Sequence, residues 1–458
     1  MRVIICGAGQ VGYNIAAYLA REENDVTVID VDPTTVAQIN DELDVNGVVG
    51  HASNPDVLKA AGANDADMII AFTQSDEVNM VACQIGHSLF GIPKKIARVR
   101  QQAYRDPAWA NLFSRAHMPI DVIISPEDIL AQEIYQRLSI PGTTFVVPMS
   151  QGKAHVIGVS CDEDCPLLNT ALHQLNGLFS DLSFRVISIV RKGKPIIPSD
   201  EEQVLEGDEV YFVVDTEHIA RTMAAFGHDE KEARRIVIAG GGHIGLQLAK
   251  LLKSNKNTNL KIIEANAGRA QYLSEQLQDV IILNGNSLDN DLLNEASIDH
   301  VETYVAVTND DESNILGSLL AKQQGADRVI TLVNNKAYST LVGPKLGVDA
   351  IVSPRSTIVA KIMQYVRRGR IKGIYSLGSG FAEVIEIEIS ETASVVNTEI
   401  EDLAMPADVI LGAIVRGDEV IIPSAKDMIR AKDRVIILAS QAQAQEVEKM
   451  FSVQVDLF

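Results

Sequence analysis

Two glycine-rich turns carry the residues of this 458-residue chain whose types and spacing predict chemistry. Each has the pattern G-x-G-x-x-G directly after an apolar run, and we call residues 7–12 and 240–245 the first and second glycine turns. A second apolar run follows each turn and ends in an acid, Asp30 or Glu264. An acid ~20 residues beyond such glycines is the fingerprint of dinucleotide binding. The duplication predicts two nucleotide sites.

The residue types in the turn have separate physical roles. Gly7 permits a tight turn, Gly9 leaves room for a pyrophosphate against the backbone, and Gly12 lets the helix pack closely on the strand. The helix N-terminus then offers N–H groups and the positive end of its dipole to phosphate. Asp30 would accept hydrogen bonds from the ribose hydroxyls, and the apolar Val31 beside it favours NAD over NADP. A glycine turn can also join strand to helix without any ligand, and a duplicated unit can keep its fold and lose its ligand.

Further candidate contacts lie where the predicted strands end. Thr73 and Gln74 end the fourth strand at the edge where ligands bind, and helix capping is the competing role for Thr73. Arg98 ends the fifth strand, where it reaches phosphate or pairs with surface acids. The predicted cofactor-binding residues of the two turns are Gly7, Ala8, Gly9, Gln10, Val11, Gly12 and Asp30, then Gly240, Gly241, Gly242, His243, Ile244, Gly245 and Glu264.

The second site departs from the first at its strand ends. Leu332 and Asn334 stand where the first half has Arg98 and Arg100, which removes two candidate phosphate cations. Glu264 also replaces an aspartate. We therefore expect the second site to bind more weakly or to hold a different nucleotide.

The repeat extends over the whole chain at an offset that stays between 225 and 235 residues. In each half, apolar strands alternate with helical stretches, which predicts a parallel sheet. A smaller β-rich unit follows. The fold class is therefore α/β, a tandem duplication in which each half is a Rossmann-like doubly wound parallel sheet followed by a small α+β domain. The expected domains are 1–123 and 232–351 for nucleotide binding, and 143–227 and 370–453 for regulation or assembly.

Composition narrows the choice of partners. A net charge of −21 argues against nucleic acid, since phosphate backbones are bound by basic surfaces. No apolar run approaches the ~18–20 residues of a membrane span, and no signal peptide precedes the first strand. We expect a soluble cytoplasmic protein.

The sequence offers no clear metal site. Cys161 and Cys165 have no matching ligand pair, so a loop thiol pair is favoured over zinc. The acid clusters Asp76-Glu77 and Asp310-Asp311-Glu312 could hold a divalent ion. Solvated acids in a loop or at a helix start are the simpler interpretation, and no metal is expected.

The chain resembles the RCK (KTN) regulators of potassium transport over essentially its full length. The resemblance rests on RVIICGAGQVG, VTVIDVD, GHASNPDVLKAAG and AFTQSDEVN near the N-terminus, and on the IIP and EGDEV motifs of the smaller domain. It implies binding of NAD(H), and of ATP or ADP, and a homo-oligomeric ring, a tetramer of tandem chains, beneath an integral membrane potassium channel subunit. It also places His51 near the adenine, with a polar loop histidine as the alternative; the second half has Asn286 there.

Two other functions stay open on the residues alone. One is an NAD-dependent oxidoreductase, and the other is a nucleotide sensor with a soluble partner. The sequence has no nucleophile elbow, no G-x-x-x-x-G-K-S/T and no H-E-x-x-H. The sequence shows no substrate domain with a group of His, Lys and Arg residues that could transfer protons. We therefore expect no catalytic residues and no enzymatic activity.

Overall fold

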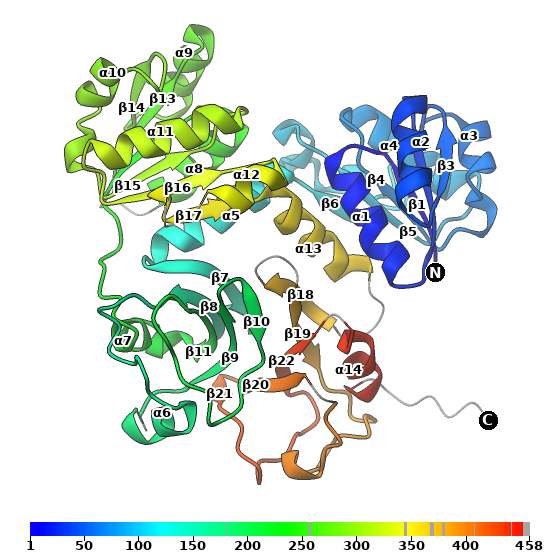
Figure 1. The fold of residues 1–458 in the computed structure, drawn as a ribbon. Coiled ribbons are helices and arrows are strands. Elements are labelled where there is room, and N and C mark those ends of the chain that lie inside the picture. Colours follow the sequence, from blue (N-terminus) through cyan, green and yellow to red (C-terminus); the bar gives the residue numbers. More distant parts are fainter. Residues whose placement is uncertain are drawn as a thin grey trace. The chain divides into compact units, whose positions relative to one another are not determined.

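The first Rossmann domain is a six-stranded parallel sheet with the strand order β3-β2-β1-β4-β5-β6 (Figure 1). The computed structural model describes residues 1–179, 181–254, 258–342, 346–366, 371–377, 381–406, 408–440 and 442–451. The strands are β1 (Arg2–Cys6), β2 (Asp25–Asp30), β3 (Asn46–Val49), β4 (Met68–Ala71), β5 (Lys94–Arg98) and β6 (Val122–Ile124). The helices are α1 (Gln10–Arg21), α2 (Pro33–Glu42), α3 (Pro55–Ala60) and α4 (Asp76–Ser88). The strand order reverses between β1 and β4, so the first glycine turn lies at the switch point where such sheets bind ligands.

The second Rossmann domain repeats this sheet with the order β14-β13-β12-β15-β16-β17. Its strands are β12 (Arg235–Ala239), β13 (Asn259–Glu264), β14 (Ile281–Asn284), β15 (Thr303–Ala306), β16 (Arg328–Leu332) and β17 (Ala350–Val352). Its helices are α8 (His243–Lys253), α9 (Ala267–Gln276), α10 (Asn290–Glu295), α11 (Asp311–Gln323) and α12 (Lys336–Leu341). The central strands β12 and β15 are apolar and almost fully buried, as expected for a parallel sheet covered on both faces.

Each half ends in a five-stranded sheet whose paired strands run antiparallel. The first has the order β10-β9-β11-β8-β7 and the second β18-β19-β22-β20-β21. The first comprises β7 (Thr143–Met149), β8 (Ala154–Ser160), β9 (Phe184–Arg191), β10 (Lys194–Ile196) and β11 (Glu209–Asp215), with α6 (Leu172–Leu178) and α7 (Ile219–Ala225). The second comprises β18 (Ile371–Leu377), β19 (Ala382–Glu388), β20 (Val409–Arg416), β21 (Glu419–Ile421) and β22 (Arg434–Ser440), with α14 (Ala444–Phe451). The predicted tandem fold class is confirmed.

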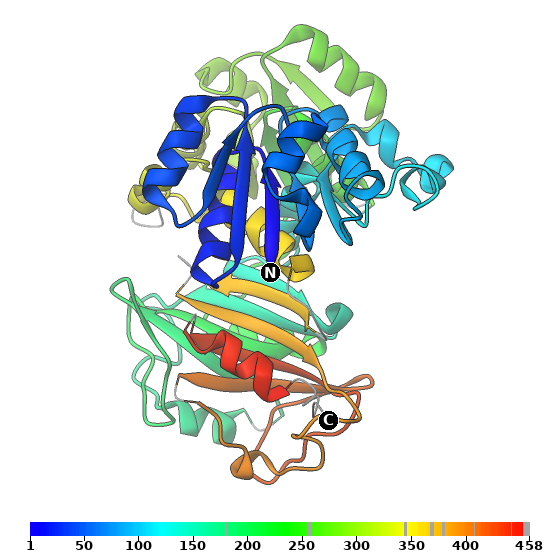
Figure 2. The ribbon, with the colours of Figure 1, turned by 90° about the vertical axis from the view of Figure 1, so that its right-hand side faces the viewer.

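The two small sheets lie next to each other (Figure 2). Side chains from both sheets form one hydrophobic core. Val156 and Tyr211 of the first sheet lie in the same buried cluster as Val384 and Ile436 of the second. A Cβ added at Gly412 would come 2.7 Å from the side chain of Val213, so the sheets approach closely at that point. Polar contacts join them too, because the buried Glu386 accepts hydrogen bonds from the backbone N–H and the hydroxyl of Ser150, both at 3.0 Å. The repeated domains therefore pack as a pair within one chain.

The boundaries between the two compact units of the chain fall within or at the start of two longer helices. Helix α5 (Pro126–Ser139) follows the first Rossmann sheet and α13 (Pro354–Val366) follows the second. One unit comprises Met1–Leu130 together with Pro354–Ile362, and the other comprises Ala131–Ser353 together with Met363–Phe458. The start of α13 thus packs with the first Rossmann domain rather than with the sheet that precedes it in the chain. Sequence analysis did not predict this exchange.

Arginines fix the end of α5 within the second unit. Arg137 donates to the carbonyl of Ile351 in β17 at 2.9 Å. Arg328 of β16 donates to the carbonyl of Arg137 at 3.2 Å and to that of Thr143 at 2.6 Å. Burial lowers the pKa of Arg328 to about 10, still well above neutrality, so the carbonyls receive a charged donor. These bonds join the first small domain to the second Rossmann domain.

Candidate functional site

The first glycine turn has the backbone geometry that its sequence predicts. Gly7 has φ +106°, which favours glycine, and a Cβ there would come 2.8 Å from the carbonyl oxygen of Phe72. A Cβ at Gly12 would come 1.9 Å from the carbonyl oxygen of Gly7, so α1 could not pack this closely on β1 with any larger residue. At Gly9, by contrast, no described atom lies within 4 Å of an added Cβ. The middle glycine faces open space, as a ligand-facing position requires.

The acid at the end of β2 contacts the glycine turn directly. Asp30 accepts a hydrogen bond from the backbone N–H of Ala8 at 2.6 Å through one carboxylate oxygen. Its other oxygen accepts from the backbone N–H of Asp32 at 3.0 Å. Gly9 occupies the N-cap of α1, and glycine has no side chain that could cap the helix N–H groups. The predicted ribose acceptor and an uncapped helix N-terminus therefore lie side by side, which is the arrangement that a nucleotide diphosphate needs.

The second glycine turn reproduces this geometry with a longer acid. Gly240 has φ +108°, and a Cβ at Gly245 would come 2.0 Å from the Gly240 carbonyl oxygen. Glu264 accepts from the backbone N–H of Gly241 at 2.8 Å and from that of Asn266 at 2.8 Å. An added Cβ at Gly242 meets no described atom within 4 Å. The replacement of aspartate by glutamate has left the contact between acid and turn intact.

An arginine that sequence analysis did not single out lies on the second turn. Arg269, in the first turn of α9, donates through Nε to the carbonyl of Gly241 at 2.7 Å and through Nη2 to that of Gly242 at 3.2 Å. The matching residue of the first half is Thr35, which donates to Asp32 instead. The second site has therefore lost the strand-end arginines but holds a cation of its own. The position of Arg269 shortly after Glu264 was the sequence signal that could have identified it.

Asparagines tie together the strand ends beside each site. Asn79 donates through its amide to the carbonyl of Thr73 at 3.2 Å and to that of Arg98 at 3.0 Å. Thr73 donates back to Asn79 through both its backbone N–H and its hydroxyl. Asn314 makes the same two carbonyl contacts in the second half, at 3.1 and 3.0 Å. Thr73 therefore bonds to Asn79 and does not cap α4. The N-cap of α4 is Ser75.

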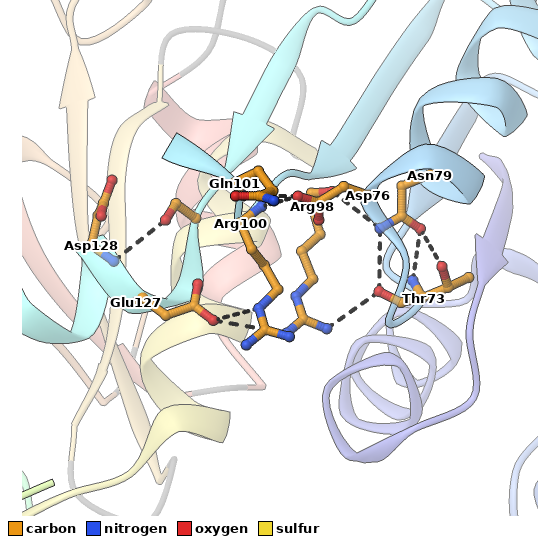
Figure 3. A network of polar contacts seen from close by, with 9 residues as sticks. Thr73, Asp76, Asn79, Arg98, Arg100, Gln101, Glu127 and Asp128 are labelled. Atoms are coloured by element: carbon orange, nitrogen blue, oxygen red, sulfur yellow. Dashed lines mark hydrogen bonds and ion pairs between the residues drawn. The ribbon is translucent and has the colours of Figure 1, made fainter. Parts of the chain in front are cut away.

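The strand-end arginines of the first half form a network with an acid from α5 (Figure 3). Arg98 donates to the carbonyl of Thr73 at 3.2 Å, and its guanidinium lies 4.0 Å from the Glu127 carboxylate. Arg100 pairs with the same carboxylate at 2.8 Å. Burial is the largest effect on Arg98 and lowers its pKa, while Glu127 opposes the shift. Sequence analysis offered phosphate contact or pairing with acids as the role of Arg98. In this structure Arg98 contacts the Glu127 carboxylate and the carbonyl of Thr73.

In the second half, a neutral amide, Asn334, takes the place of the Arg100 guanidinium. Asn334, at the position of Arg100, donates its backbone N–H and its side-chain amide to Asp311 at 2.9 and 3.0 Å. The matching Asp76 accepts the backbone N–H groups of Arg100 and Gln101, both at 2.8 Å. The two sites therefore differ in the charge carried at this edge.

Comparison with known proteins decides the family. The TrkA-N domain matches residues 3–126 and 236–354, and the TrkA-C domain matches 156–227 and 384–452. The Trk system potassium uptake protein TrkA of Azorhizobium caulinodans is 46% identical over 459 residues, covering 100% of both chains. That of Halomonas elongata is 39% identical, again over 100% of both. The chain belongs to the TrkA family. This confirms the resemblance identified in the sequence.

Solved structures support the same fold. The crystal structure of the GsuK RCK domain superposes with a TM-score of 0.60 at 18% identity, covering 98% of this chain and 94% of that one. A GsuK channel described as bound to NAD superposes with a TM-score of 0.61 at 18% identity, covering 98% of this chain and 78% of that one. The relatives from both organisms are named as transport proteins and not as enzymes, in agreement with the absence of predicted catalytic residues. Within the described ranges, no helix is long and apolar enough to cross a membrane.

The remaining predicted contacts of the TrkA-N domains lie at their surface. His51 follows β3, is exposed, and its Nδ1 lies 2.7 Å from the Ser53 hydroxyl. Gln10 and Gln74 are exposed, as is His243, the first residue of α8. Asp32 is the N-cap of α2, and hydrogen bonds led by that from the Thr35 hydroxyl lower its pKa. His51, Gln10, Gln74 and His243 stay predicted nucleotide contacts.

Neither the acids nor the cysteines form a metal site in the described part of the chain. No group of at least three His, Cys, Asp or Glu side chains there could hold an ion. Cys161 and Cys165 are buried, and a hydrogen bond from the Cys161 thiol lowers the pKa of Cys165. The matching residues of the second TrkA-C domain are Ile389 and Ala393, both buried. The repeated fold therefore does not depend on the thiols.

Proposed function

We propose that this chain is a nucleotide-binding regulatory subunit that gates an integral membrane potassium channel subunit of the Trk type. The ligands are NAD(H), and ATP or ADP. The observation that carries the proposal is the contact of Asp30 with the backbone N–H of Ala8, because it joins a ribose acceptor to a phosphate-binding helix start. Glu264 and Gly241 repeat the contact in the second half.

Family and fold neighbours support the choice of potassium transport over the alternatives. The curated relatives carry the name of a potassium uptake system, and solved neighbours are described as a channel bound to NAD and as a protein bound to ADP. An NAD-dependent oxidoreductase would need a substrate domain with proton-handling groups. Each nucleotide domain here is instead followed by a sheet that packs against its own repeat. That packing suits an assembly and regulatory role.

Gating requires that the nucleotide prefer one state of the complex. A ligand shifts a conformational equilibrium only by its differential affinity for the two states, and typical couplings are ~1–3 kcal/mol. We propose that tandem chains assemble as a homo-oligomeric ring, a tetramer, at the cytoplasmic face of the membrane as a peripheral subunit. Nucleotide binding at the glycine turns then biases the ring toward the conducting or the closed state of the channel subunit.

Reconstitution tests the proposal. The chain is co-expressed with the membrane potassium channel subunit of the same cell, purified as a complex, and placed in vesicles for potassium flux measurement with NADH, ATP or ADP. We expect co-purification and a nucleotide-dependent change in flux that Gly9→Val weakens. A chain that binds nucleotide but never co-purifies with the channel supports the soluble sensor instead. Turnover of NADH with a carbonyl substrate supports the oxidoreductase.

A further inference from the structure

An arginine from the second half of the chain lies at the first glycine turn. Arg355 is the second residue of α13, and its Nε donates to the side-chain oxygen of Gln10 at 3.2 Å. Gln10 is the first residue of α1 and follows Gly9 directly. Both residues belong to the compact unit of the first Rossmann domain, because Pro354–Ile362 packs there. The guanidinium therefore stands beside the helix N-terminus at which a nucleotide phosphate binds.

Within the described ranges, the charge of Arg355 has no anionic partner. Among the residues that the structure describes, no carboxylate forms an ion pair with Arg355, and its one hydrogen bond is to the neutral amide of Gln10. An arginine carries five N–H donors in a planar fork that suits phosphate. Most of its donors are therefore available to a ligand. The side chain is neither fully buried nor fully exposed.

Its position is also unusual for a helix start. Negative charge is favoured in the first turn of a helix and positive charge is not, because of the helix dipole. The matching residue of the first half is Glu127, which agrees with this rule and pairs with Arg100. In the second half, an arginine occupies a position at which an acid would stabilise the start of α13 more. Stabilisation of α13 therefore does not explain the arginine.

We propose that Arg355 is a phosphate ligand of the first nucleotide site, contributed by the second half of the chain. The inference rests on the proposed nucleotide function. The ligand class is a nucleotide with a pyrophosphate or longer phosphate chain, such as NADH or ATP. Because α13 leads into the second TrkA-C domain, a nucleotide in the first half would also hold the helix that carries the other half's regulatory domain.

Calorimetric titration of the full chain with NADH and with ATP tests this. All variants carry Gly242→Val, so that the heat comes from the first site. Arg355→Gln should weaken binding of both nucleotides about tenfold or more, as expected for a lost charge-assisted bond. Arg355→Lys should retain part of the affinity. Arg115→Gln, which removes one exposed positive charge elsewhere in the same unit, should leave it unchanged.

Arg355→Glu separates a ligand role from a structural one. It installs the residue type of the matching position and should leave the unfolding temperature without nucleotide unchanged or raised, since an acid suits a helix start. Nucleotide affinity should fall at least as far as in Arg355→Gln. Unchanged affinity in both variants, with the parent chain still binding, overturns the inference and leaves the proposed function standing. A parent chain that binds neither nucleotide, and regains no binding when Gly242 is restored, overturns the proposed function itself.

Discussion

The carboxylate of Asp30 accepts a hydrogen bond from the backbone N–H of Ala8 at 2.6 Å, across the gap between the end of β2 and the first glycine turn. The acid therefore stays beside the turn before any nucleotide arrives. Pre-positioning of this kind reduces the ordering that binding must accomplish.

Removing this acid should weaken the first site. The carboxylate would accept hydrogen bonds from the ribose hydroxyls, each contributing about 1.5–3 kcal/mol for a charged acceptor. We expect Asp30→Ala to lower the affinity for NADH about tenfold or more. The affinity of Asp30→Asn should lie between those of the wild type and Asp30→Ala. Isothermal calorimetry on chains that carry Gly242→Val measures this. Equal affinity in all three chains would show that Asp30 is not the ribose ligand.

Two glycines of the same turn should respond in opposite ways. Gly9→Val adds a side chain to open space, so the unfolding temperature should hold while nucleotide binding at the first site is lost, because the branched side chain occupies the pyrophosphate position. Gly12→Ala forces a Cβ to within 1.9 Å of the Gly7 carbonyl oxygen and should cost about 1–3 kcal/mol of stability. Thermal unfolding with and without nucleotide distinguishes them. A wild-type ligand shift in Gly9→Val would mean that this turn is only structural, or that the second site supplies the whole signal.

The two sites should contribute unequally to control of potassium flux. The first has Arg98 and Arg100 at its strand ends, and the second has Leu332 and Asn334 there with Arg269 on its turn. We expect Gly9→Val to abolish most nucleotide control and Gly242→Val to cost less. Flux through reconstituted complexes across nucleotide concentrations measures both. Equal losses would refute the asymmetry, and no loss in either would refute gating through these turns.

Acid should destabilise the first small domain through His155. Burial lowers the pKa of this β8 histidine to about 4, against an ordinary value of 6.5. Between these pH values the unfolded chain binds the proton and the folded chain does not, so stability falls as the pH falls through this window. We expect the unfolding temperature of the wild type to drop more between pH 7 and pH 4.5 than that of His155→Asn. Parallel pH profiles would contradict the assignment.

The sequence by itself determined the elements that depend on local chemistry. A glycine is required wherever the chain turns with positive φ or approaches another backbone closely, so Gly7 and Gly12 predicted the turn that the structure contains. The alternation of buried strands with helices predicted the parallel sheets. Asp30 was found because it ends the strand beside the turn. The repeat in the chain predicted that Glu264 would take the same place.

Only the tertiary structure decided which distant side chains join these turns. Asn79 recurs as Asn314, but the strand ends that it connects are adjacent only in the folded sheet. Arg98 lies where the sequence placed it, yet packing of α5 brings Glu127 to it. Arg355 is separated from Gln10 by 345 residues, and no periodicity in the chain relates them. Such contacts follow from the burial of apolar faces over whole domains, which positions helices such as α13 without any local sequence signal.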